Sequence, residues 1–313
     1  MARKDRLDGV GLAGLLVSAI LFGINQVVIK VVDDGLQPVF FAGLRSLGAF
    51  FCIWGWMVWQ GRPPRLTPGT IGAGVLAGLV FSAEFLCLFL ALDHTTVVRT
   101  SIIFYSMPLW MSVIAHYALP GERITPLKAL GLVLAFAGVA WALVNRGSGG
   151  GKASLTGDLF ALGAAFGWAG TALMARGSAM ARIKPEMQLF WMVGVSGPVL
   201  IAASVFFGPW LRELQPIHIA GVLFQIVVVV SAGFILWLWL LSVYPASVVT
   251  SFSFLTPLLS IGFGWLLLGE PVGPQTFSAG ALVALGIVLI ARAPRAGPSG
   301  GIPERKESVS ARS

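Results

Sequence analysis

Two charged side chains, Arg45 and Glu84, lie well inside long apolar stretches of the sequence. Each falls about 8 residues from one end of its stretch, so at about 1.5 Å per helical residue both lie about 12 Å deep. A charge inside an apolar membrane span costs roughly 2.5 to 3.5 kcal/mol, which makes each a candidate for function. The two side chains could pair with each other. Alternatively, Glu84 binds a substrate ammonium group or carries a coupling proton, and Arg45 binds a substrate carboxylate.

The fourth apolar stretch gathers its polar side chains on one helix face. Ser101, Tyr105, Pro108 and Ser112 follow an i, i+4, i+7, i+11 spacing. In a membrane helix such a face turns away from lipid, either into a packing seam between helices or toward a cavity. The spacing alone leaves both interpretations open.

The middle of the sixth stretch combines an aromatic ring with small and polar residues. Trp168 stands near Thr171 at mid-depth, whereas membrane tryptophans favour the interfaces. The ring therefore stacks either on a substrate side chain or against a packed core. We assign Trp237 and Trp239, near the end of the eighth stretch, to the interfacial belt. Small residues in the sixth stretch predict close helix packing; they are Gly163, Gly167 and Gly170.

A duplicated unit surrounds the two prolines inside apolar stretches. Residues 100–126 and 250–274 each contain an apolar run with a proline inside it, Pro108 or Pro257, and each run stops at a Gly-Glu pair. Each proline predicts a kink, which serves either as a hinge or as a static bend that shapes a cavity. The glutamates, Glu122 and Glu270, we expect to cap the helices that directly follow them.

Apolar stretches long enough to cross a bilayer organise the whole chain. Of its 313 residues, 57% are hydrophobic and 11% are charged, whereas soluble proteins average roughly 25% charged residues. We predict an all-α membrane protein with ten transmembrane helices. The predicted spans are roughly 10–32, 37–59, 69–92, 96–118, 126–144, 156–181, 186–207, 218–241, 246–268 and 274–292.

Ten spans in two similar units predict two inverted five-helix repeats, because an odd number of crossings reverses the second unit. We divide the chain into a cytoplasmic N-terminus (1–9), a first repeat (10–146), a linker (147–155), a second repeat (156–292) and a disordered cytoplasmic tail (293–313). The net charge is +8, and most of the 21 Lys and Arg residues fall on the side of the N-terminus. The positive-inside rule therefore predicts that both termini are cytoplasmic and explains the charge without a nucleic-acid partner.

Several segments together resemble the EamA repeat of the drug/metabolite transporter superfamily. They are GLAGLLVSAILFGINQVVIKV with GLRSLGAF after it, the later echo GDLFALGAAFGWAGTALMARG, and the two units that run from a proline to Gly-Glu. The resemblance covers the chain from about Val10 to Arg292. It implies ten helices in two inverted halves and export of amino acids or related metabolites, with the YddG-like amino acid exporter as the nearest functional type.

Enzyme motifs, metal-ligand spacings and cofactor fingerprints are absent from the sequence, so we predict neither an enzyme nor a cofactor. We predict a monomeric secondary transporter of the bacterial inner membrane that exports amino acids or similar metabolites by alternating access, with possible proton coupling. The alternatives are a drug or nucleoside-type exporter of the same fold and a passive channel. We expect Pro108 and Pro257 to act as hinges and Glu84 to carry the coupling. The residues expected at the substrate cavity are Asn25, Glu84, Ser101, Tyr105, Trp168, Thr171 and Ser253.

Overall fold

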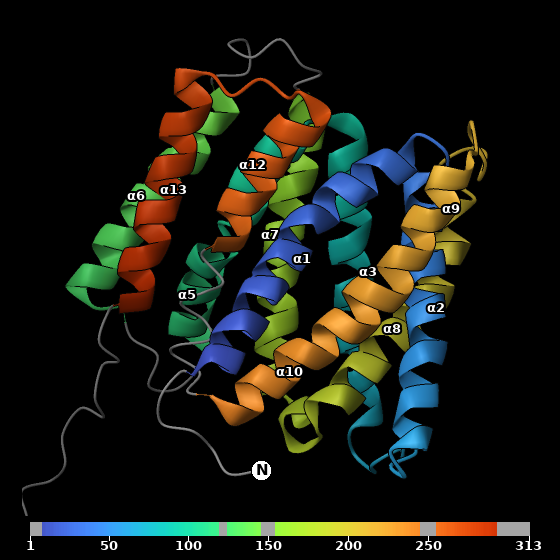
Figure 1. The fold of residues 1–313 in the computed structure, drawn as a ribbon. Helices are drawn as coiled ribbons and strands as arrows, with labels where there is room; N and C mark the ends of the chain where they lie inside the picture. Colours follow the sequence, from blue (N-terminus) through green and yellow to red (C-terminus); the bar gives the residue numbers. More distant parts are fainter. Residues whose placement is uncertain (1–7, 119–123, 145–153, 245–254, 293–313) are drawn as a thin grey trace, which may run out of the picture.

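The computed structural model describes residues 8–118, 124–144, 154–244 and 255–292. Within these ranges every named element is helical, and an isolated bridge joins Leu36 to Leu211 (Figure 1). The predicted all-α class is therefore confirmed. The elements are α1 (Gly9–Asp33), α2 (Pro38–Trp59), α3 (Ile71–His94), α4 (Val97–Phe104), α5 (Met107–Ala118), α6 (Pro126–Val144), α7 (Leu155–Gly177), η1 (Ala179–Arg182), α8 (Pro185–Ser204), α9 (Pro216–Leu223), η2 (Phe224–Gly233), α10 (Phe234–Val243), α12 (Leu255–Leu268) and α13 (Pro274–Arg292).

Seven helical stretches in the described ranges are long and apolar enough to cross a membrane. Three shorter apolar helices, 126–142, 255–268 and 274–290, occupy the remaining predicted spans. The structure thus supports a multi-pass membrane protein. Ten crossings and the inversion of the two halves remain predictions.

Proline fixes where many of these helices begin. It is the first residue of five helices, where its missing N–H has no intrahelical partner to lose and its fixed φ suits the first turn. These residues are Pro38, Pro126, Pro185, Pro216 and Pro274. The start of α1 is capped differently, because the Asp8 carboxylate accepts a hydrogen bond from the Gly11 N–H at 2.9 Å.

Glycine allows α3 and α7 to approach closely. A Cβ at Gly167 would lie 2.7 Å from the Cβ of Glu84 and 2.8 Å from its Cα, and a Cβ at Gly163 would lie 3.1 Å from the Cys87 sulfur. Helices in lipid gain little from burying apolar surface, so close van der Waals packing of this kind holds them together. The packing role predicted for these glycines is confirmed.

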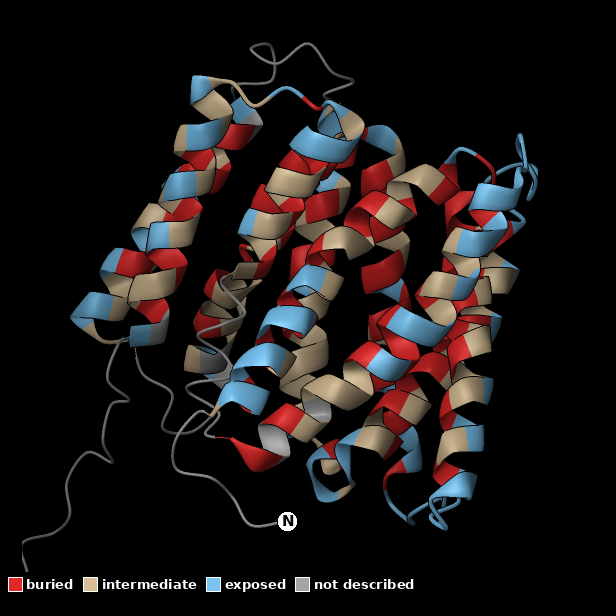
Figure 2. Ribbon diagram, viewed as in Figure 1, coloured by how far each residue is buried: buried red, intermediate tan, exposed pale blue. Residues whose placement is uncertain are grey.

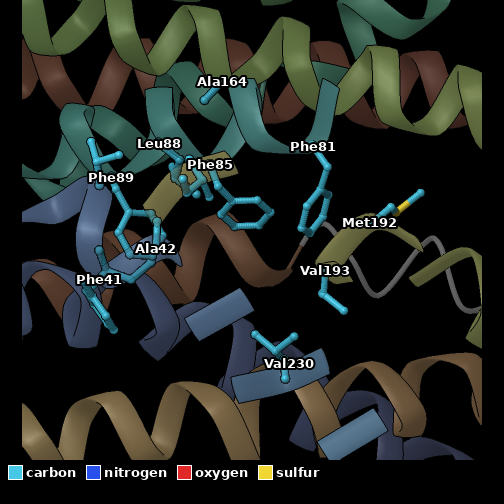
Figure 3. Packing of buried hydrophobic residues seen from close by; sticks show 14 of the residues in the cluster. Phe41, Ala42, Phe81, Phe85, Leu88, Phe89, Ala164, Met192, Val193 and Val230 are labelled. Carbon is cyan, nitrogen blue, oxygen red and sulfur yellow. The ribbon is translucent and has the colours of Figure 1, made fainter. Parts of the chain in front are cut away.

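The largest hydrophobic cluster joins α2, α3, α8 and η2 (Figure 3). Phe41 packs edge-on against Phe89 with ring centroids 5.1 Å apart, and Val193 and Val230 contribute from the second half of the chain. Buried residues face the interior of the bundle, and exposed residues, many of them apolar, cover its outer faces (Figure 2). An apolar outer surface suits a lipid environment.

Two predicted spans depart from a straight α-helix. The fourth is broken at Tyr105 and Ser106, so α4 and α5 are separate helices, with Pro108 as the second residue of α5. The residues predicted to form one polar face, from Ser101 to Ser112, are therefore divided between two helices. The eighth predicted span contains η2, a ten-residue π-helical stretch between α9 and α10. Such stretches are rare and often occur at functional sites.

Candidate functional site

A cavity of about 150 Å³ lies between helices from both halves of the chain. Its wall is mostly aromatic and aliphatic, with a few polar side chains, as is usual for small-molecule sites. The volume is well below the roughly 300 to 1,000 Å³ of drug-sized sites and suits a small metabolite. The aromatic residues of the wall are Phe22, Phe85, Phe104, Tyr105, Trp168, Phe234 and Trp237, and its other polar residues are Asn25, Gln26, Arg45 and Thr256.

Arg45 is the charged residue of this wall. Its side chain is buried, and its guanidinium lies over the rings of Phe85 and Phe89, 4.0 and 5.0 Å from their centroids. Nη1 lies 3.4 Å from the Oε1 of Gln225, and Nε has no hydrogen-bond partner. A buried guanidinium with an unused donor is suited to binding an anionic group that enters the cavity.

Asn25 and Gln26 bring α1 to the cavity. The Oδ1 of Asn25 is buried without a hydrogen-bond partner, so it can accept a hydrogen bond from a bound molecule. Gln26 is already used, because its Oε1 accepts a hydrogen bond from the Ser101 hydroxyl at 2.8 Å. Ser101 therefore lies one contact behind the wall and joins α4 to α1.

The π-helical stretch η2 contacts both Asn25 and Arg45. Gln225 donates from Nε2 to the main-chain oxygen of Asn25 at 3.1 Å, and its Oε1 faces Arg45. One side chain of η2 thus holds α1 and α2 in position at the cavity. Gln225 was not among the predicted site residues, although a glutamine inside an apolar run was a usable signal.

Glu84 lies behind the cavity wall. It is buried, and its Oε2 accepts a hydrogen bond from the Thr171 hydroxyl at 2.9 Å. The ion pairs found among the described residues do not include one between Glu84 and Arg45. The direct ion pair, one of the alternatives left open by the sequence, is therefore not formed, because the two groups have hydrogen-bond partners on different helices; their opposite charges still attract each other.

The predicted cavity residues thus separate into three groups. Asn25, Tyr105 and Trp168 line the cavity. Glu84, Ser101 and Thr171 make hydrogen bonds outside the wall. Ser253 lies outside the described residues.

The structure shows which way two tryptophan rings face, Trp168 and Trp237. Trp168 lies in the cavity wall and meets Phe104 edge-on, with centroids 5.5 Å apart. Trp237, which was predicted to be interfacial, turns its ring toward the bundle interior. It lines the cavity and contacts Phe22 at a centroid distance of 6.3 Å. Its position near the end of an apolar run resembles that of a belt residue, but only the neighbouring helices decide which way the ring faces.

Polar contacts close one end of the bundle, which we call the Arg212 end and define by residues 33–38, 92–97 and 204–216. Arg212 bonds both carboxylate oxygens of Asp93, at 2.6 and 3.1 Å, and the main-chain oxygen of Asp33 at 2.7 Å. The Asp93 carboxylate raises the pKa of the Arg212 guanidinium above its ordinary value. Gln37 adds a hydrogen bond to the Ser204 main-chain oxygen at 2.7 Å. These contacts join the connection between α8 and α9 to the ends of α1 and α3.

Glu270 also acts at this end. Its carboxylate accepts hydrogen bonds from the Val97 and Val98 N–H groups, both at 2.7 Å, at the start of α4. It therefore caps α4, and the prediction that it caps the next helix, α13, is wrong. Burial raises the pKa of its carboxyl above the ordinary value, although both hydrogen bonds oppose the shift. The equivalent Glu122 lies outside the described residues.

An all-helical bundle with membrane-length apolar helices and a buried cavity between them defines a multi-pass membrane protein. Residues 9–144 and 155–292 match the EamA-like transporter family. Since the match covers most of the sequence, the chain belongs to the EamA-like transporter family, and the resemblance to the EamA repeat is confirmed.

Individual proteins show the same relationship. The chain is similar to the uncharacterized transporter YvbV of Bacillus subtilis (strain 168), with 30% identity over 87% of this chain and 88% of the relative. It is 25% identical to a probable amino-acid metabolite efflux pump of Escherichia coli (strain K12), over 92% of this chain and 95% of the relative. A solved crystal structure matches 90% of this chain and 97% of its own at a TM-score of 0.63 and 17% identity, a likeness of fold.

Proposed function

We propose that this transporter is a secondary carrier that exports amino acids or similar small amphipathic metabolites across the bacterial inner membrane. The observation that carries the proposal is the cavity of about 150 Å³, where the Nε of Arg45 and the Oδ1 of Asn25 are buried without partners. A buried donor and a buried acceptor left unused each cost about 1 to 3 kcal/mol. A ligand that satisfies both removes this cost.

The zwitterionic group of an amino acid matches these two atoms. The Arg45 guanidinium would bind the carboxylate, and the Asn25 Oδ1 would accept a hydrogen bond from the ammonium group. The aromatic wall, including Trp168 and Trp237, would receive the side chain of the substrate. A wall that contacts the variable side chain mainly through apolar surface supports broad selectivity among amino acids.

The helix contacts support the two-repeat plan. The contact of α1 with α12 has its counterpart five spans later in the contact of α7 with α4 and α5. The contact of α3 with α7 likewise corresponds to that of α1 with α9, η2 and α10. Each contact thus recurs with the two halves interchanged. This is expected of ten spans in two inverted halves, an arrangement that recurs in secondary transporters.

Alternating access needs one end closed and the other open. The contacts of Arg212 and Gln37 close the Arg212 end, whereas the cavity extends along α1 from Gln26 toward Leu15, away from that end. We infer that this conformer faces the side where α1 begins, which the positive-inside rule assigns to the cytoplasm together with both termini. The break at Tyr105 and Ser106, next to Pro108, is where the two access states would differ, with Pro257 in the first turn of α12 as its counterpart.

We propose that Glu84 carries the coupled proton. Its carboxyl group is buried against Thr171 and lies next to Phe85, which belongs to the cavity wall. A carboxyl group inside a membrane bundle is a common proton carrier in transporters. We further propose that one chain suffices for transport, because the cavity is formed within a single chain.

The test is transport by the purified protein in proteoliposomes. Radiolabelled amino acids are offered outside, with unlabelled amino acid or buffer inside, with and without a pH gradient. Saturable uptake that internal substrate stimulates supports the carrier. If uptake is linear in concentration and internal substrate has no effect, a passive channel replaces it. If no amino acid is taken up while drugs or nucleosides are, the fold serves a different substrate class.

The names of two relatives favour amino acids over the drug alternative. The Escherichia coli relative and its counterpart in Salmonella typhimurium (strain LT2) are both described as probable amino-acid metabolite efflux pumps. The small cavity points in the same direction, because drug-sized ligands usually occupy sites of roughly 300 Å³ or more.

A further inference from the structure

A second cavity, of about 450 Å³, lies at the opposite end from Arg212, between the connection that follows α2 and the start of α8. We call it the basic pocket. Four basic side chains line it, against the single acidic side chain of Glu186. The four basic residues are Arg62, Arg65, Arg182 and Lys184.

These charges are not neutralised within the described part of the chain. The ion pairs found there involve none of the four basic residues. Concentrated, unpaired guanidinium groups point to a phosphate-bearing ligand.

Apolar surface leads directly to this pocket. Trp54, Val58 and Trp59, on the last two turns of α2, are exposed by 46%, 51% and 81%, and Arg62 follows within three residues. Met57 and Met187 form a buried floor beneath the charges. A free phosphate ion has no apolar part that could contact the exposed face of α2. A phospholipid could place its acyl chains along α2 and its phosphate among the arginines.

The corresponding connection at the other end of the bundle differs in chemistry. There the connection from α8 to α9 carries Arg212, which is already paired with Asp93 at 2.6 Å. The positive-inside rule accounts for cations at this end of the bundle, but it does not require four of them to line one concavity. The basic pocket is also built from both halves, with Arg62 and Arg65 from the first and Arg182 and Lys184 from the second.

We propose that the basic pocket binds the headgroup phosphate of an anionic phospholipid such as phosphatidylglycerol. The bound phosphate bridges the end of α2 and the start of α8. Because these helices belong to different halves of the transporter, the lipid stabilises the arrangement of the halves at this end.

The test measures lipid binding to the purified full-length protein in a nonionic detergent. Native mass spectrometry follows the titration of dioctanoyl phosphatidylglycerol, with dioctanoyl phosphatidylcholine and inorganic phosphate as comparisons. We expect saturable binding of one phosphatidylglycerol. Arg182→Gln should weaken it about tenfold or more, because a charge-assisted hydrogen bond is lost. Arg292→Gln is the matched control, since it removes one charge from an exposed position at the end of α13 and should leave the affinity nearly unchanged.

Three results would overturn the proposal. Equal binding of phosphatidylcholine would show that the phosphate charge is not recognised. Equal losses in Arg182→Gln and Arg292→Gln would show general surface attraction instead of a pocket. Binding of inorganic phosphate as tight as that of the lipid would make this a site for a soluble anion. Arg62→Gln serves as a second variant if Arg182→Gln does not fold, and Arg182→Lys separates charge from the forked geometry of arginine.

Discussion

The Thr171 hydroxyl donates a hydrogen bond to the Glu84 carboxylate at 2.9 Å, across the contact between α7 and α3 that Gly167 makes possible. This bond and the partners of Arg45 assign the two intramembrane charges to different tasks. Arg45 faces the cavity and Glu84 faces the seam between helices. A substitution at either residue should therefore produce a different defect.

Glu84→Gln should keep counterflow of amino acids but lose its stimulation by a pH gradient, because the amide is nearly isosteric and cannot carry a proton. Thr171→Val is the control, since it removes the hydrogen bond and leaves the carboxyl group in place. It should retain the gradient response and lose about 1 kcal/mol of stability. A Glu84→Gln variant that responds normally to the gradient would return Glu84 to a structural role.

Arg45→Lys should weaken the apparent affinity for amino acids about tenfold or more, because lysine keeps the charge but not the forked donor geometry. It also loses the stacking on Phe85 at 4.0 Å. The measurement is the KM for uptake in proteoliposomes. Uptake of an amino acid amide, which lacks the carboxylate, shows whether the loss of affinity depends on contact between residue 45 and the carboxylate. If the amide and the amino acid are affected equally, Arg45 does not bind the carboxylate.

Gly167→Ala should destabilise the protein by about 1 to 3 kcal/mol, because the new Cβ meets the Cα of Glu84 at 2.8 Å and the backbone cannot easily yield. Gly55→Ala is the matched control. Gly55 is exposed in α2, a Cβ added there would meet no atom within 4 Å, and the variant should gain about 0.5 to 1 kcal/mol of stability. Thermal unfolding midpoints in detergent report both changes, and equal midpoints would contradict the close contact.

Arg212→Gln should increase opening at the Arg212 end. The pair with Asp93 is partly exposed, with side-chain exposures of 36% and 18%, so it contributes about 0.5 to 1 kcal/mol. Its loss should speed labelling of an Ala19→Cys probe in the cavity wall about two- to fivefold from that side. Asp93→Asn should have a similar effect, and the double variant should add little. Additive effects would show that the two residues act independently.

Much of the architecture follows from local sequence. Apolar runs of membrane length fix the helices, because backbone polar groups in lipid must be satisfied within each segment. Pro38, Pro126 and Pro274 mark helix starts for a local steric reason. The glycines of α7 indicate a close contact, although they do not identify α3 as the partner. The family resemblance follows from the same runs in the same order.

Which way a side chain faces depends on helices that are distant in the sequence. Trp237 at the end of a span looks like an interfacial residue until α1 places Phe22 against it. Glu270 precedes α13 in the chain, yet it caps α4, more than 170 residues earlier. Gln225 reaches Arg45 and Asn25 from a π-helical stretch whose register no local pattern predicts.

Local sequence was enough to predict that two buried charges, a set of mid-depth polar residues and two prolines would lie within a helical membrane protein. Hydropathy and steric preference are properties of short segments, so they follow from the sequence without knowledge of the tertiary structure. The packed bundle was needed to show that Arg45 lines the cavity while Glu84 bonds to Thr171. The rotation of each helix is set by contacts with its neighbours, and those contacts form only when both halves of the chain pack together.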